Sequence, residues 1–182
     1  MKVDPGALLR CWAVEVEVGG ATYRIPAHPA AVWMQTVIEG SYDDIVPGMV
    51  EGDVDPIDEA LLDGKIRQRD LTAAAREALA AAAGMKWWIA ERMAYLAANS
   101  WLAGELLLRG VDPHRLSLAA YLSAAYRAAS RVLDTAKLAK LDMDLERPPA
   151  GVSPDEWFDP EEAARNFLAA MGASAGGPDG DG

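Results

Sequence analysis

The stretch that decides the fold runs from residue 85 to residue 140 and consists of two apolar segments joined by a short link. The first reads M-K-W-W-I-A-E-R-M-A-Y-L-A-A-N-S-W-L-A-G-E-L-L-L-R-G (85–110), the link reads V-D-P-H-R (111–115), and the second reads L-S-L-A-A-Y-L-S-A-A-Y-R-A-A-S-R-V-L-D-T-A-K-L-A-K (116–140). In both segments apolar residues recur at steps of three and four, the period of an amphipathic helix. The two stripes consist of Ile89, Met93, Leu96, Ala103 and Leu107, and of Leu118, Leu122, Ala125, Ala129, Leu133 and Ala136.

The link has the residues of a helix end, a turn and a helix start. Gly110 stands where a helix C′ residue belongs, and Asp112-Pro113 is typical of a turn. Ser117 is a suitable N-cap for the second segment. The stretch therefore predicts two antiparallel helices packed face to face, which indicates a small helical protein but no particular activity.

A β-hairpin is predicted near the N-terminus. Residues 11–18 alternate between apolar and acidic side chains, which is typical of a half-buried strand. Gly19-Gly20 separates them from the second strand-like run, residues 21–25, and this spacing favours a primed two-residue turn. An isolated hairpin is only marginally stable, so we expect its apolar face to pack on the helices.

Shorter helices are expected between the hairpin and the central stretch. Their predicted ranges are residues 30–39 after Pro29, residues 55–62 beginning at Asp55-Pro56, and residues 65–83 with Asp70 as a cap of the main part. Within the acidic segment 39–63, Pro47-Gly48 predicts a turn.

The C-terminal part of the sequence changes character after Lys140. The proline-rich and acidic run that follows is typical of a connector, and a short helix is predicted to end near Met171. The glycine-rich end offers nothing apolar to bury and predicts disorder. The expected organisation is a mainly α domain over residues 1–150, with the hairpin packed on a helical bundle, then a connector with a short helix over 151–171 and a disordered tail over 172–182.

Composition narrows the classes of function. The chain has 182 residues, 51% of them hydrophobic, and a formal net charge of −11, which argues against a nucleic-acid partner. The single cysteine, Cys11, cannot form an internal disulfide, and the N-terminus lacks the apolar core of a signal peptide. The charge-free run 93–104 is shorter than the ~20 residues of a membrane span. We therefore expect a soluble, cytoplasmic protein.

No motif for catalysis or metal binding is present. The carboxylates of Asp53, Asp55, Asp58 and Glu59 do not fit a calcium loop, because Ile57 and Asp58 occupy the positions of a ligand and of the glycine. The two histidines, His28 and His114, and Cys11 do not stand in any known nucleophile pattern. The sequence predicts no enzyme, no metal and no cofactor. Arg92 and Arg109 are expected to be solvated.

The tryptophans are the residues best suited to contact a partner. Trp87 and Trp88 are adjacent, so they cannot share a helix face. One of them is expected in the core, and the other on a second packing surface, under the hairpin or on a partner. Trp33, Trp87, Trp88 and Trp101 are many large side chains for a bundle otherwise rich in alanine.

Several short motifs occur in an order that resembles a known family. They are V-E-V-G-G-A-T-Y-R-I-P-A (16–27), A-A-V-W (30–33), V-P-G-M (46–49), A-G-M-K-W-W-I-A (83–90), G-V-D-P-H-R-L-S-L-A-A-Y-L-S-A-A-Y (110–126) and P-P-A-G (148–151). Over about residues 11–150 the chain resembles the tail assembly chaperones of long-tailed phages of actinobacteria.

The resemblance implies a non-enzymatic protein of the host cytoplasm that binds the tape measure protein and is absent from the mature virion. It also implies that the chain is the shorter product of a programmed frameshift, whose longer form contacts the tail tube protein. Self-association is a further expectation, and nucleic acid and membrane are not expected partners. The family has no catalytic residues to carry over, so Trp33, Trp87, Trp88 and Trp101 are the client-binding candidates.

Two other functions are compatible with a small helical protein. A head–tail connector subunit would remain in purified virions, whereas a chaperone would leave. An enzyme is the weakest alternative, because no catalytic motif is present.

Overall fold

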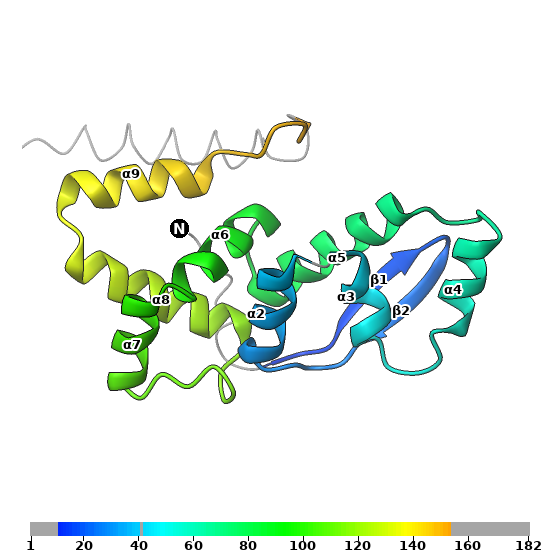
Figure 1. Ribbon diagram of the computed structural model, residues 1–182, viewed down its shortest axis with the longest axis horizontal. Helices are drawn as coiled ribbons and strands as arrows, with labels where there is room; N and C mark the ends of the chain where they lie inside the picture. The colour runs from blue at the N-terminus through cyan, green and yellow to red at the C-terminus, as the bar shows by residue number, and fades with distance from the viewer. Residues whose placement is uncertain (1–10, 41, 154–182) are drawn as a thin grey trace, which may run out of the picture. The chain divides into compact units, whose positions relative to one another are not determined.

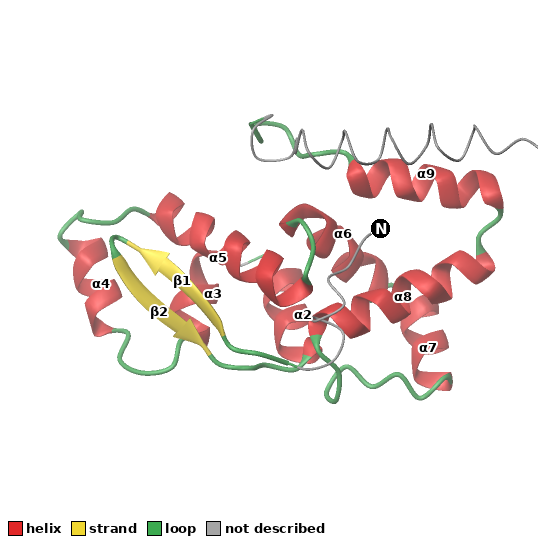
Figure 2. Cartoon of the chain, turned by 180° about the vertical axis from the view of Figure 1, so that it is seen from behind, coloured by secondary structure: helices red, strands yellow, loops and turns green. Residues whose placement is uncertain are grey.

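The computed structural model describes residues 11–40 and 42–153 and is mainly helical, with a two-stranded sheet near the N-terminus (Figures 1 and 2). The predicted fold class is confirmed. The chain divides into two units, Met1–Arg147 and Pro148–Gly182, and only residues 148–153 of the second are described. The elements of the first unit are β1 (Val14–Val18), β2 (Ala21–Ile25), α2 (Ala30–Glu39), α3 (Tyr42–Met49), α4 (Asp55–Leu62), α5 (Gln68–Ala83), α6 (Trp87–Ala97), α7 (Ser100–Leu108), α8 (Leu118–Val132) and α9 (Thr135–Glu146).

The predicted hairpin is present, with β1 and β2 antiparallel and Val14 opposite Ile25. Gly19 and Gly20 have φ values of +60° and +83°, as a primed turn requires. A Cβ added to Gly19 would clash with Cγ2 of Ile66, a buried residue just before α5. The turn therefore needs glycine both for its backbone conformation and for the close approach of Ile66.

The apolar face of the hairpin packs on α5. Val14, Val16 and Val18 are at most 5% exposed, and β1 lies against α5, which also contacts α3 (Figure 1). Leu79 of α5 is fully buried. The expectation that a helix supports the hairpin is confirmed, and the supporting helix is the alanine-rich one.

Helices α2, α7 and α9 assemble around α6 and α8. Helix α6 contacts α2, α5, α8 and α9, and α8 also contacts α2 and α7. Met93 of α6 and Leu122 of α8 are fully buried. The loop before α8 also supplies hydrogen-bond acceptors for the first N–H groups of α2, which have no partner within their own helix. The Ala30 N–H donates to the Leu116 carbonyl and the Ala31 N–H to the Pro113 carbonyl.

The prediction of one helix in each half of the central stretch is wrong. The first half breaks between α6 and α7, where the Asn99 side chain accepts the Trp101 N–H at 3.4 Å. The second half breaks after Leu133, where the Asp134 carboxylate accepts the Lys137 N–H at 2.9 Å. Helix α9 then runs to Glu146, through residues predicted to form a connector. Both breaks occur at side chains that cap a new helix.

The breaks change which predicted stripe residues are buried. Leu107 is 67% exposed, because α7 restarts with a different rotation, and Ala136 is exposed at the start of α9. Leu96, Ala103 and Leu133 are partly buried. The stripe residues that do lie in the core are Ile89, Met93, Leu118, Leu122, Ala125 and Ala129.

Two local predictions before the central stretch are also corrected. Pro47-Gly48 does not form a turn but lies within α3, where Ile45 and Val46 are fully buried and Met49 nearly so. Burial of these side chains outweighs the hydrogen bond that proline cannot donate. Asp70 is the third residue of α5 rather than its cap, and its carboxylate accepts the Arg67 N–H at 2.8 Å.

Arg92 is not simply solvated, as the sequence suggested. Its guanidinium donates to the main-chain carbonyls of Asp144, of Leu145 at 3.3 Å and of Arg147 at 2.5 Å. These carbonyls belong to the last turn of α9 and the residue after it, where acceptors lack partners within the helix and a positive charge is favoured. A side chain of α6 thus caps the C-terminus of α9. The predictions for residues 154–182 lie outside the described residues.

Candidate functional site

The four candidate tryptophans occupy different environments. Trp33 on α2 and Trp88 on α6 are each 2% exposed and belong to the core. Trp87 is partly buried, and Trp101 on α7 is 43% exposed. The structure therefore does not bring the four together on one surface, and Trp101 is the candidate that is free to meet a partner.

The second packing surface inferred for the Trp87–Trp88 pair lies within the chain. The Trp87 ring packs edge-on against Tyr42 of α3 at 6.4 Å and against Trp88 at 5.7 Å. The guanidinium of Arg76 on α5 lies 4.2 Å from the Trp87 ring centre, a cation–π contact. Trp87 therefore joins α3, α5 and α6.

Tyr42 in this cluster is held in its protonated form. Burial raises the pKa of its phenol well above the ordinary value of 10, and the negative charge of Glu91 raises it further, although Arg76 lowers it. A phenol with so high a pKa is neither a base nor a nucleophile at neutral pH. The cluster is best explained as packing between helices.

Helix α7 has apolar residues on two opposite faces. Leu102 and Leu106 are at most 1% exposed and anchor the helix, which contacts α8 and α6. The opposite face carries Trp101, Leu107 and Leu108, which are 43%, 67% and 87% exposed. Gly104 lies among them at helical spacing and is partly exposed, and no other element comes within 4 Å of the position that an added Cβ would occupy. We call Trp101, Gly104, Leu107 and Leu108 the α7 strip.

The α7 strip is unusual for a surface helix, whose outer face is normally polar. Single exposed apolar side chains are common, but neighbouring ones on one helix face mark an interaction surface. Sequence reasoning found Trp101 but placed Leu107 in the core and did not consider Leu108. The signal that could have found the strip is Asn99-Ser100, a helix start that sets the rotation of α7.

No protein-family model, curated protein or solved structure matches this chain. The candidate site is therefore assigned from its own residues.

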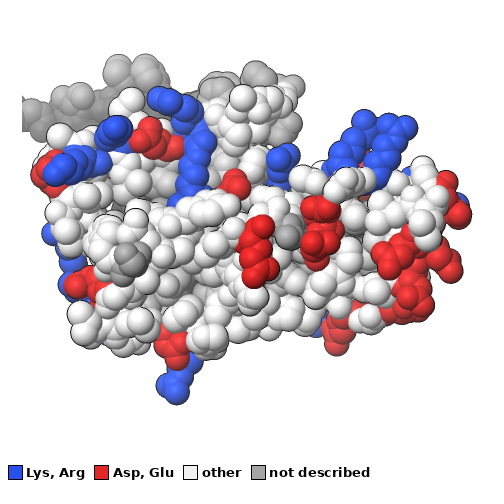
Figure 3. Space-filling model, viewed as in Figure 1, with Lys and Arg blue, Asp and Glu red and all other residues white. Residues whose placement is uncertain are grey.

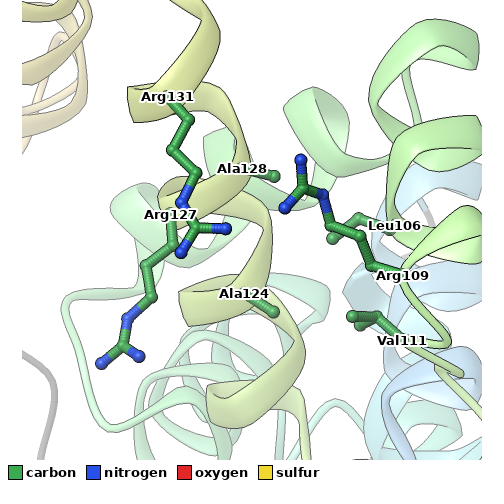
Figure 4. Close-up of a pocket in the computed structure, with 7 residues that line it drawn as sticks. All are labelled: Leu106, Arg109, Val111, Ala124, Arg127, Ala128 and Arg131. Atoms are coloured by element: carbon green, nitrogen blue, oxygen red, sulfur yellow. The ribbon is translucent and has the colours of Figure 1, made fainter.

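A small hollow lies between α7 and α8 (Figure 4). Its volume is about 150 Å³. Binding sites for small molecules usually measure ~300–1,000 Å³, so this one is too small for most metabolites. Its lining combines apolar and cationic side chains, namely Leu106, Arg109, Val111, Ala124, Arg127, Ala128 and Arg131.

Acidic side chains are concentrated at another part of the molecule. On the face drawn in Figure 3 they gather at the end where α4 lies. Exposed members of this group are Asp53, Asp55, Asp58, Glu59 and Asp63. Within residues 11–40 and 42–153, no three His, Cys, Asp or Glu side chains are placed to hold a metal ion, and no helix is long and apolar enough to cross a bilayer.

Proposed function

We propose that this protein is a phage tail assembly chaperone that binds apolar helical segments of the tape measure protein through the α7 strip. The proposal rests on the motif order in residues 11–150 and on one structural observation. That observation is an apolar face on α7 that no described element covers, with Trp101 and Leu108 seven residues apart. A client helix would contact this face with side chains at steps of three and four, as in helix-in-groove recognition.

The acidic surface supports the same proposal. Net charge of one sign keeps copies of a protein apart, so a complex with an aggregation-prone client would remain dispersed. Binding through the strip would be mainly hydrophobic and only weakly dependent on salt. A longer frameshifted form would add contact with the tail tube protein, and self-association of the chaperone would use surfaces outside the strip.

Co-expression with the tape measure protein of the same genome tests the proposal. The wild-type chain should keep the client soluble and co-purify with it, whereas a Leu107→Ser/Leu108→Ser variant should do neither. Leu62→Ser is the matched control, because Leu62 on α4 is 88% exposed but lies outside the strip. If the client is equally soluble with and without this chain and no complex forms, the chaperone proposal is wrong.

The protein composition of purified virions distinguishes an assembly chaperone from a head–tail connector. A chaperone should be absent from mature particles. Stoichiometric copies in them would instead favour the head–tail connector.

A further inference from the structure

The hollow between α7 and α8 is bordered by arginines on both helices. Arg109 follows the last residue of α7, and Arg131 is in the last turn of α8. In Figure 4 their side chains reach toward one another over the hollow, while that of Arg127 extends away from it. Two guanidinium groups that approach one another repel, and an anion between them would relieve the repulsion.

The positive charge at the hollow is only partly neutralised. Arg109 donates to the Glu105 carboxylate, with its Nε 2.8 Å from Oε1. Arg127 and Arg131 form no ion pair within the part of the chain that the structure describes. In a chain of net charge −11, this hollow is therefore a local cationic site.

The floor of the hollow is apolar. Leu106 and Ala128 are 1% and 4% exposed, and Val111 and Ala124 complete the lining. A volume of about 150 Å³ matches that of an engineered protein cavity that binds one benzene molecule. The space therefore suits one aromatic or branched side chain.

We propose that the hollow is a docking site for an acidic protein segment, which inserts one apolar side chain between flanking carboxylates. Arginine suits this partner because its planar fork binds carboxylates in a bidentate manner. The inference goes beyond the proposed chaperone function, because it concerns a contact led by charge and does not depend on the tape measure protein as client.

Fluorescence anisotropy with labelled synthetic peptides and the full-length chain tests the docking site. The probe is a short peptide with one phenylalanine between runs of glutamate, and it should bind less tightly as salt is raised. Replacing its phenylalanine by glycine should weaken binding at least about tenfold, and replacing its glutamates by lysine should abolish it. Equal binding of the glycine peptide would show that the hollow is not occupied and would overturn the proposal.

Three variants locate the contact. Arg131→Glu should abolish binding of the probe, and Ala124→Leu, which fills the hollow without changing charge, should weaken it strongly. Arg115→Glu is the control, because Arg115 lies in the loop before α8, its side chain is 86% exposed and the substitution makes the same change in charge. Thermal melts confirm that each variant is folded.

Two results of this series would overturn the proposal. If Arg115→Glu and Arg131→Glu weakened binding of the peptide equally, only long-range charge would attract the peptide. Displacement of the probe by a short oligodeoxynucleotide at equal concentration would assign the arginines to nucleic acid instead.

Discussion

Gly104→Ala should stabilise the protein while weakening its binding to a client. Gly104 is the fifth residue of the nine-residue helix α7, where glycine is less favourable than alanine by ~0.8–1.0 kcal/mol. Apart from its chain neighbours and the adjoining backbone of α7, no atom lies within 4 Å of a methyl group added there. The full gain should therefore be realised, and for a domain of this size it corresponds to a rise in melting temperature of roughly 2–4 °C.

The opposite effect on binding follows from the position of Gly104 within the α7 strip. A glycine at this point lets a partner backbone approach closely, and a methyl group would occupy that space. Overpacking of a close contact costs typically ~1–3 kcal/mol, so we expect the client to bind about 5- to 150-fold more weakly. Differential scanning fluorimetry measures the first effect, and titration of the immobilised tape measure protein measures the second.

Gly48→Ala provides the matched control for this experiment. Like Gly104, Gly48 lies within a helix and has nothing within 4 Å of the position that an added Cβ would occupy, but it lies on α3, outside the α7 strip. The Gly48→Ala substitution should leave the affinity for the client unchanged. A lower melting temperature for Gly104→Ala would contradict the position of this residue in the helix. Unchanged affinity would contradict close contact at the strip.

Four further predictions concern the fold. Leu122→Ala should cost ~2–5 kcal/mol in urea denaturation, because Leu122 is fully buried, and a cost below ~0.5 kcal/mol would place it outside the core. Gly19→Ala should lower the melting temperature, whereas Gly20→Ala, at a turn position with open space, should do so less; equal losses would contradict the contact with Ile66. Arg92→Ala should speed hydrogen exchange in α9, and unchanged exchange there would contradict the cap. The hydrogen bond that Tyr126 donates to Asp142 raises the pKa of the phenol from about 10 to about 12. The contribution of this bond to stability is therefore complete below pH 10 and is lost toward pH 12. Tyr126→Phe should remove this part of the decline in melting temperature at alkaline pH, and an unchanged decline would contradict the role of the bond.

The hairpin and most helices could be predicted from the sequence because their signals are local. Alternation over residues 11–18 and the pair Gly19-Gly20 define the hairpin without reference to the rest of the chain. The breaks at Asn99 and Asp134 were missed because apolar periodicity continues across both, so the pattern favoured long helices. In each case a short side chain accepts a backbone N–H and starts a new helix, although the apolar pattern favours continuing the previous one.

The candidate site could be predicted only in part, because it depends on the rotation and packing of α7. Once the helix begins at Ser100, Leu107 turns outward, and the strip appears. The surroundings of Trp87 depend on Tyr42 and Arg76, which come from two other helices. No periodicity within one segment contains that information.

The hydrogen bonds of Arg92 have a consequence for the order of folding during synthesis. Their acceptors lie 52, 53 and 55 residues further along the chain. Because translation delivers the N-terminal elements first, α6 can pack on α5 while this guanidinium still faces water. It reaches its acceptors only when α9 has emerged as far as residue 147. The packing of α9 on α6 is therefore a late step in folding, and a chain truncated before residue 144 would lack all three acceptors.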